Sequence, residues 1–140
     1  MTTQEKKAYL RQYRAIKNEV DSLKCEIEEI KDLRRSLSGI DYGKDRVQST
    51  PSDNLINSIC TQEKLEERLS KKINEGIARL DDISKCVDLM ENPSERAILR
   101  YKYFTQMTWE DIASKMYISR TKVISIYGTA LKNFAVRRNS

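Results

Sequence analysis

The sequence predicts an all-α protein in which a long antiparallel helical hairpin precedes a compact module of short helices. Charged residues make up 34% of the chain, which has only four glycines and two prolines, a composition typical of long exposed helices. Apolar residues recur at alternating steps of three and four along two long stretches, and this is the heptad pattern of coiled coils. The last third instead carries short helical patterns separated by capping residues and turns.

The first long helix is expected over residues 4–37. Its apolar seam consists of Tyr9, Tyr13, Ile16, Val20, Leu23, Ile27, Ile30 and Leu37. Arg34 interrupts the seam, and charged and amide residues dominate the rest of the surface. A helix cannot bury such a narrow stripe alone, so we expect a partner helix, from the same chain or from another.

A loop over residues 38–53 should connect this helix to a second one over residues 54–91. Glycine, proline and small polar residues mark the loop. The apolar seam of this second helix consists of Ile59, Leu69, Ile73, Leu80, Ile83, Val87 and Met90. It is flanked by Leu65 and Ile77 and interrupted by Gln62, Glu66 and Gly76. Because two helices offer little core, we expect residues 1–91 to form a homo-oligomer, most simply a dimer.

A new unit should begin at Asn92, an N-cap residue followed by Pro93 at the first helical position and Glu95 three residues after the cap. Residues 92–140 are expected to form three helices: about 94–104, a second capped by Thr108, and a third capped by Ser119 that runs to about Phe134. The order of Ile112-Ala113, a turn flanked by Met116 and Ile118, and inward Val123 and Ile126 is typical of a helix-turn-helix. The remaining core should comprise Ile98, Leu99, Tyr101, Phe104, Trp109, Tyr127, Ala130, Leu131 and Phe134.

Two positions of this module leave alternatives open. Position 117 is where such turns often need a positive φ and glycine, but it holds Tyr117. Either the turn takes another conformation or Tyr117 stores some strain. The missing side chain at Gly128 leaves room either where the helix faces the groove of DNA or for a neighbouring helix.

The residue inventory excludes several kinds of chemistry. The chain has no histidine, which removes histidine acid–base catalysis, Ser-His and Cys-His nucleophiles and Cys/His zinc sites. Cys25, Cys60 and Cys86 lie far apart, and we interpret them as reduced helix residues. No glycine-rich phosphate-binding motif is present. We therefore expect neither an enzyme nor a bound metal or cofactor. No apolar stretch is long enough to span a membrane and no signal region is evident, so we expect a cytoplasmic protein.

Charge is unevenly distributed. Residues 1–91 carry 17 Lys and Arg against 18 Asp and Glu, whereas residues 92–140 carry nine against three, a net charge of +6. Such a basic module favours a polyanionic partner, although a basic surface that only aids solubility would look similar.

The segments RAILRYKYF, TWEDIA and ISRTKV, followed by Ala130-Leu131, resemble the promoter-reading final region of bacterial sigma factors. The whole chain resembles phage late-transcription regulators of the ArpU/RinA type, and VQSTPSD (residues 47–53) resembles a loop motif of small phage proteins of this group. The resemblance implies a phage-encoded protein in a bacterial host that switches on late genes, with RNA polymerase as a further partner.

In a helix-turn-helix the start of the second helix reads bases in the major groove of double-stranded DNA. Arg120 is then the candidate for guanine, and Thr121 and Ile124 for thymine methyl groups, with Ser125 on the same exposed face. Lys115, Lys122, Lys132 and Ser119 are candidates for phosphate contacts. The alternatives are a three-helix bundle without a ligand, the DNA-recognition subunit of a packaging terminase, and a coiled-coil protein–protein adaptor.

Overall fold

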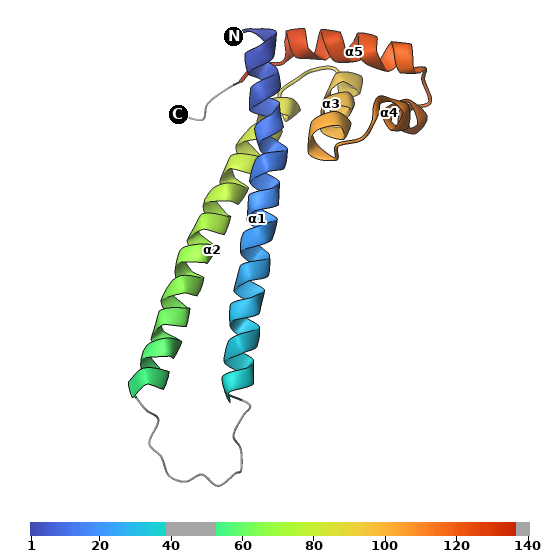
Figure 1. Ribbon diagram of the computed structural model, residues 1–140. Coiled ribbons are helices and arrows are strands. Elements are labelled where there is room, and N and C mark those ends of the chain that lie inside the picture. Colours follow the sequence, from blue (N-terminus) through green and yellow to red (C-terminus); the bar gives the residue numbers. More distant parts are fainter. Residues whose placement is uncertain (39–52, 137–140) are drawn as a thin grey trace. The chain divides into compact units, whose positions relative to one another are not determined.

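The computed structural model describes residues 1–38 and 53–136 (Figure 1), and this part is entirely helical apart from its connections, as predicted. Ser38 and Asp53, the ends of the expected loop, belong to helices. The rest of that loop (residues 39–52), with its VQSTPSD motif up to Ser52, and the last two arginines of the chain lie outside the described residues. The elements are α1 (Thr3–Ser38), α2 (Asp53–Asp88), α3 (Pro93–Leu99), the π-helical η1 (Arg100–Phe104), α4 (Trp109–Met116) and α5 (Arg120–Asn133).

Packing groups the chain into two compact units that the sequence pattern did not suggest. One unit comprises residues 1–18 and 77–140, and the other residues 19–76. The expected boundary between 91 and 92 does fall between α2 and α3. The first turns of α1 and the last turns of α2 nevertheless pack with the C-terminal helices, so the unit that contains the helix-turn-helix is larger than residues 92–140.

Residues 19–76 form a two-helix unit whose apolar seam is buried within the chain itself. The buried positions are Val20, Ile27, Ile30, Leu69 and Ile73, all members of the two predicted seams. The partner that the first seam requires is therefore the second helix of the same chain. These seam residues need no second copy of the chain to cover them. The expected homo-oligomer stays a prediction.

The two charged interruptions of the seams meet in this unit. Arg34 forms an ion pair with Glu66, and neither side chain is fully exposed. Each residue breaks the apolar repeat of its own helix, and each is the counter-charge of the other. The pairing fixes one register between the helices, since a shift of either helix would leave a half-buried charge without its partner.

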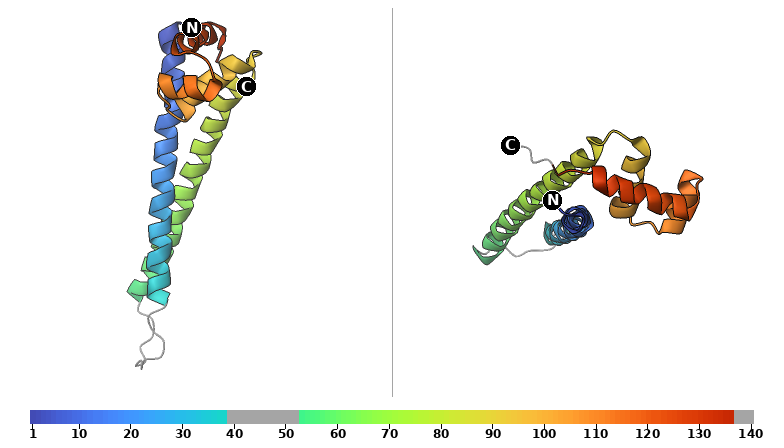
Figure 2. Two further views of the ribbon diagram at one scale, coloured as in Figure 1. Left: turned by 90° about the vertical axis from the view of Figure 1, so that its right-hand side faces the viewer. Right: turned by 90° about the horizontal axis from the view of Figure 1, so that it is seen from above.

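In the larger unit, the start of α1 lies against both α2 and α5, as the further views also show (Figure 2). The Tyr9 hydroxyl is 3.7 Å from the sulfur of Cys86 on α2, and its ring lies 6.1 Å from the ring of Phe134, which follows α5. The Tyr13 ring stacks on Phe104 at 3.9 Å. The Lys6 ammonium donates hydrogen bonds to the last carbonyls of α5, at Leu131 and Lys132. Aromatic packing and a C-terminal cap thus anchor α5 to α1.

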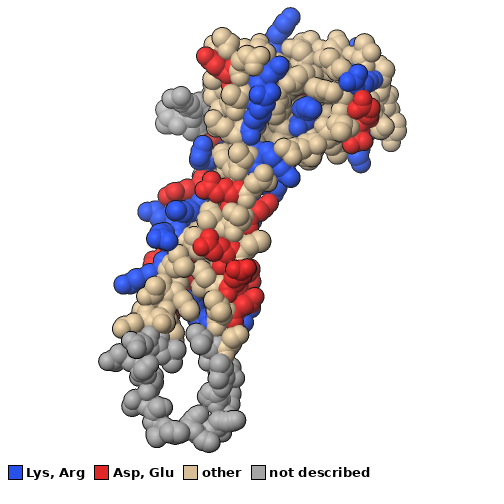
Figure 3. Space-filling model, viewed as in Figure 1, with Lys and Arg blue, Asp and Glu red and all other residues tan. Residues whose placement is uncertain are grey.

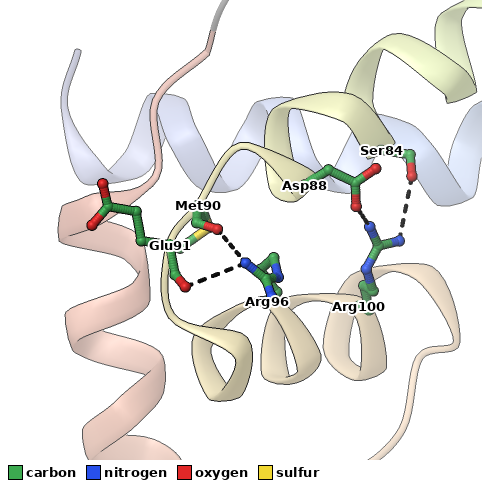
Figure 4. Close-up of polar contacts among 6 residues, drawn as sticks. All are labelled: Ser84, Asp88, Met90, Glu91, Arg96 and Arg100. Carbon is green, nitrogen blue, oxygen red and sulfur yellow. Dashed lines mark hydrogen bonds and ion pairs between the residues drawn. The ribbon is translucent and has the colours of Figure 1, made fainter.

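Two arginines hold α3 and η1 against the end of α2 (Figure 4). Arg96 donates to the carbonyl oxygens of Met90 and Glu91 at 2.5 and 3.3 Å. Arg100 pairs with Asp88 and donates to the Ser84 hydroxyl at 3.3 Å. The carbonyls that Arg96 binds would otherwise lack partners beyond the end of a helix, so these contacts fix the direction in which the chain enters α3.

Asn92 caps α3 as predicted, accepting hydrogen bonds from the amides of Ser94 and Glu95. The Glu95 side chain does not complete a reciprocal capping box. It is buried at 4% exposure and accepts hydrogen bonds from the Asn133 amide at 2.9 and 3.2 Å. The hydrogen bonds with Asn133 therefore connect the beginning of α3 to the end of α5. A buried carboxylate needs such partners, because burying a charge without a partner is costly.

Candidate nucleic-acid interface

The α4–turn–α5 segment has the local structure that its sequence predicts. The Thr108 hydroxyl caps α4 by accepting from the amide of Asp111, and the Ser119 hydroxyl caps α5 by accepting from the amide of Lys122. Ile98, Ile112 and Val123 are fully buried and form the centre of the module. The half-buried side chains around them are Tyr101, Met107, Trp109, Ala113, Met116, Ile118, Ile126 and Tyr127. The predicted core is confirmed, and Tyr101 and Trp109 belong to it.

Tyr117 forms the turn between α4 and α5, and its backbone is left-handed, with φ 59° and ψ 39°. Of the two alternatives for this position, the turn keeps the conformation that favours glycine. A non-glycine residue there costs about 1–2 kcal/mol. The Tyr117 side chain recovers little of this cost by packing, because it is 93% exposed. The turn thus displays an aromatic ring beside the start of α5.

All eight candidate DNA-contacting residues are exposed, and they come from α4, the cap and α5. They are Lys115, Ser119, Arg120, Thr121, Lys122, Ile124, Ser125 and Lys132. The sequence of α5 contains no acidic residue, so nothing on this helix repels a phosphate. Ile124 is 41% exposed, so this face also offers an apolar side chain that could contact a thymine methyl group.

Gly128 lies on the same exposed helix face. It follows Thr121 and Ser125 at steps of four and three and precedes Lys132 by four, so these residues share one stripe of the helix. A Cβ atom built at Gly128 would meet nothing within 4 Å. Within the described part of the chain, the room at Gly128 therefore opens to solvent and not onto a neighbouring helix.

Arg120 has a partner that sequence reasoning did not anticipate. Its Nε atom lies 2.9 Å from a carboxylate oxygen of Glu110, in the first turn of α4, and both side chains are more than half exposed. The pair holds the guanidinium beside α4. Since exposed ion pairs are worth only about 0.2–1 kcal/mol, an incoming anion could displace Glu110 at small cost.

Aromatic rings link η1, α4 and α5. Trp109 and Tyr127 meet edge to face at 4.8 Å between ring centroids, and the hydroxyls of Tyr103 and Tyr127 are 2.5 Å apart. Burial and then this hydrogen bond raise the pKa of Tyr103 above its ordinary value, so the phenol stays neutral. The Lys102 ammonium lies 4.3 Å from the centre of the Trp109 ring, a cation–π contact. These contacts fix the orientation of α4 and α5 relative to η1.

Sequence reasoning missed a basic surface at the start of α1. Lys7, Arg11 and Arg14 are spaced by four and three residues, which places them on one helix face. Figure 3 shows basic side chains along the N-terminal part of α1, with another in the hollow between it and the C-terminal helices. The neutral balance of residues 1–91 concealed this surface, although the spacing itself was visible in the sequence.

The division into compact units sharpens the charge asymmetry. Residues 1–18 and 77–140 together contain 16 lysines and arginines against eight acidic residues, a net charge of +8. Residues 19–76 contain ten against 13, a net charge of −3. The unit that contains α4 and α5 is thus more basic than the C-terminal segment considered alone.

The described residues contain neither a metal-binding cluster nor a membrane-spanning helix. No three of the described Cys, Asp and Glu side chains form a group that could hold a metal ion. No helix in residues 1–38 or 53–136 is both long and apolar enough to cross a membrane.

Residues 37–135 match a family described as "Protein of unknown function (DUF1492)", a range that covers most of the chain and all of α2 through α5. No curated protein and no solved structure matches the chain.

Proposed function

This chain belongs to the DUF1492 family, and we propose that it is a sequence-specific DNA-binding protein that regulates transcription. In this proposal α5 is the recognition helix and α4 supports it across the DNA backbone. The observation that carries the proposal is the exposed face of α5. It begins at a hydroxyl-capped N-terminus, follows a left-handed turn, contains no acid and belongs to a unit of net charge +8.

The proposed roles differ along this face. Arg120 and Thr121 lie in the first turn of α5, where side chains of a recognition helix reach base edges. Lys132 lies in the last turn, where phosphate is the expected partner. Gly128 lies between them with open space around it, so the DNA backbone or a base edge can approach α5 closely there.

The finer proposal is that the protein acts as a phage-encoded regulator of late genes. It rests on the resemblance of RAILRYKYF, TWEDIA and ISRTKV to sigma-factor and ArpU/RinA-type sequences. RNA polymerase is then a further partner, and the exposed Tyr117 ring at the turn is a candidate contact for either DNA or polymerase.

Paired titrations test the roles of Arg120 and Lys132. Binding sites are first selected from random DNA, and each variant is then titrated on the selected site and on a scrambled duplex over a range of salt. Arg120→Ala should lose about 1–3 kcal/mol on the selected site and relax the choice of base at one position. Lys132→Ala should weaken both duplexes equally and reduce the salt slope by about one.

The wild-type protein provides the control for both variants. Its affinity should fall about 10³-fold or more between about 50 and 200 mM salt if about six phosphates are contacted. If Arg120→Ala loses affinity equally on both duplexes, Arg120 contacts only phosphate and α5 does not read sequence.

A further inference from the structure

We propose that a basic pocket formed by α1, η1 and the segment after η1 binds the phosphate group of an anionic ligand. The pocket has a volume of about 450 Å³ and is lined by Arg11, Arg14, Lys102, Tyr103 and Gln106. All five residues belong to the same compact unit. The pocket is separate from the exposed face of α5 and uses no residue proposed above to contact DNA.

No carboxylate of the described residues forms an ion pair with a cation of this pocket. Three of its five lining residues are cationic and none is acidic. In the described part of the chain, Arg11, Arg14 and Lys102 take part in none of the ion pairs with carboxylates. Cations that face one pocket repel one another, and an anion between them removes that repulsion. Elsewhere in this unit arginines do find carboxylates, as Arg100 does with Asp88.

The donor geometry suits phosphate better than a single negative charge. Arg11 and Arg14 are three residues apart on α1, so their guanidinium groups project from the same side of the helix. A guanidinium presents paired N–H donors that match two oxygens of a phosphate. Gln106 adds an amide at the rim, and its backbone adopts a left-handed conformation with φ 53°, which is uncommon for a non-glycine residue.

The remaining walls keep the pocket neutral or positive. The Tyr103 hydroxyl is already paired with Tyr127 at 2.5 Å, and Tyr103 stays protonated because burial raises its pKa. The Lys102 ammonium lies over the Trp109 ring at the start of α4, and this cation–π contact holds its side chain in place. The contacts with Tyr127 and Trp109 thus hold Tyr103 and Lys102 in place and link the pocket to α5 and α4.

Two ligands carry the required group. One is a phosphate of the DNA backbone, and this source rests on the proposed function. The other is a small phosphorylated molecule, for which a volume of about 450 Å³ is within the usual range of ligand sites. The second source does not depend on DNA binding at all, so the two can be tested separately.

The first arm of the experiment uses inorganic pyrophosphate and the full chain. Isothermal titration at low ionic strength should detect binding to the wild-type protein, with sodium chloride of matched ionic strength as the blank. Arg11→Gln and Arg14→Gln should each weaken this binding about tenfold or more, as expected for the loss of a charge-assisted hydrogen bond. Arg14→Lys should restore part of it. Lys24→Gln is the matched control, because Lys24 is an exposed cation of α1 that lies outside the pocket.

The second arm measures the salt slope of binding to scrambled DNA. If the DNA backbone is the source, Arg14→Gln should reduce the slope by about one relative to Lys24→Gln. A slope that is equal in both variants, together with pocket-dependent pyrophosphate binding, assigns the site to a free phosphorylated ligand. Wild-type protein that binds pyrophosphate but no DNA would contradict the proposed function and still support the phosphate-binding pocket.

The proposal is overturned by either of two results. The first is pyrophosphate binding that Arg11→Gln and Arg14→Gln leave unchanged, because the anion then binds elsewhere. The second is an absence of pyrophosphate binding combined with equal DNA salt slopes for Arg14→Gln and Lys24→Gln. Thermal unfolding of each variant establishes that the fold is retained. Arg11 is exposed, so its substitution should not perturb the core.

Discussion

Glu110→Gln should increase DNA affinity if Arg120 reads a base. In the free protein the Nε atom of Arg120 lies 2.9 Å from Glu110, so DNA must take the guanidinium away from this carboxylate. Releasing an exposed pair is worth about 0.2–1 kcal/mol, a factor of about 1.4 to 5. Removing one negative charge at about 10 Å from a phosphate adds about 0.4 kcal/mol before screening, a factor of about two. The variant should therefore bind about 3- to 10-fold more tightly at low salt.

Two comparisons isolate the pair from the general change in charge. Asp111→Asn removes the neighbouring acid of the same helical turn, which forms none of the ion pairs seen in the described residues, and should gain only about twofold. In an Arg120→Ala background, Glu110→Gln should also gain only about twofold. Fluorescence anisotropy with a labelled duplex measures the affinity of the wild type, the three single variants and the double variant. Equal gains in affinity for Glu110→Gln and Asp111→Asn, or a full gain for Glu110→Gln without Arg120, would show that the ion pair does not oppose DNA binding.

The remaining predictions concern the stability of the unit that contains α4 and α5. Tyr117→Val places a β-branched residue at φ 59° and should lower the free energy of unfolding by about 1 kcal/mol, whereas Tyr117→Gly should change it by less than about 1 kcal/mol. Urea unfolding measures both variants, and an unchanged free energy of unfolding for Tyr117→Val would contradict a strained turn. Gly128→Ala should add about 0.5–1 kcal/mol because nothing obstructs the new methyl group; a lower melting temperature would refute the open surround. Asn133→Ala should cost about 1–3 kcal/mol because it leaves the buried Glu95 carboxylate without its partner, and an unchanged urea midpoint would show that the bond contributes nothing. Burial and the hydrogen bond to Tyr127 raise the pKa of Tyr103, so its neutral form stabilises the fold fully below pH about 10 and less as the pH rises further. The free energy of unfolding should therefore fall more steeply above that pH in the wild type than in Tyr103→Phe. Identical pH profiles for the two proteins would contradict this.

The features that sequence predicted best are local ones. Thr108 and Ser119 are identifiable as caps because capping depends on residues within one helical turn. The burial of Val20 and Ile27 follows from the heptad repeat alone. The left-handed conformation at position 117 was one of two alternatives that the sequence left open, and only the geometry of the turn decided between them.

Features that depend on tertiary packing were not predicted. Nothing along the chain places Arg11 and Arg14 beside Lys102, since 88 residues separate Arg14 from Lys102 and the contacts of Tyr13 with Phe104 bring them together. Counting charge over residues 1–91 averaged this basic surface with the net negative charge of residues 19–76, which belong to the other compact unit. Glu110 and Arg120 lie on different helices across a turn, so their ion pair also follows from the packing of α4 on α5.

The central claim is that α5 reads a DNA sequence, and its most direct test is a ratio of two affinities. The wild-type protein is titrated at physiological salt on a duplex selected from random DNA and on a scrambled duplex of the same length and composition. The selected site should bind at least about 10³-fold more tightly than the scrambled duplex. A ratio near one, with both affinities falling steeply with salt, would contradict the account and leave a basic protein without sequence preference.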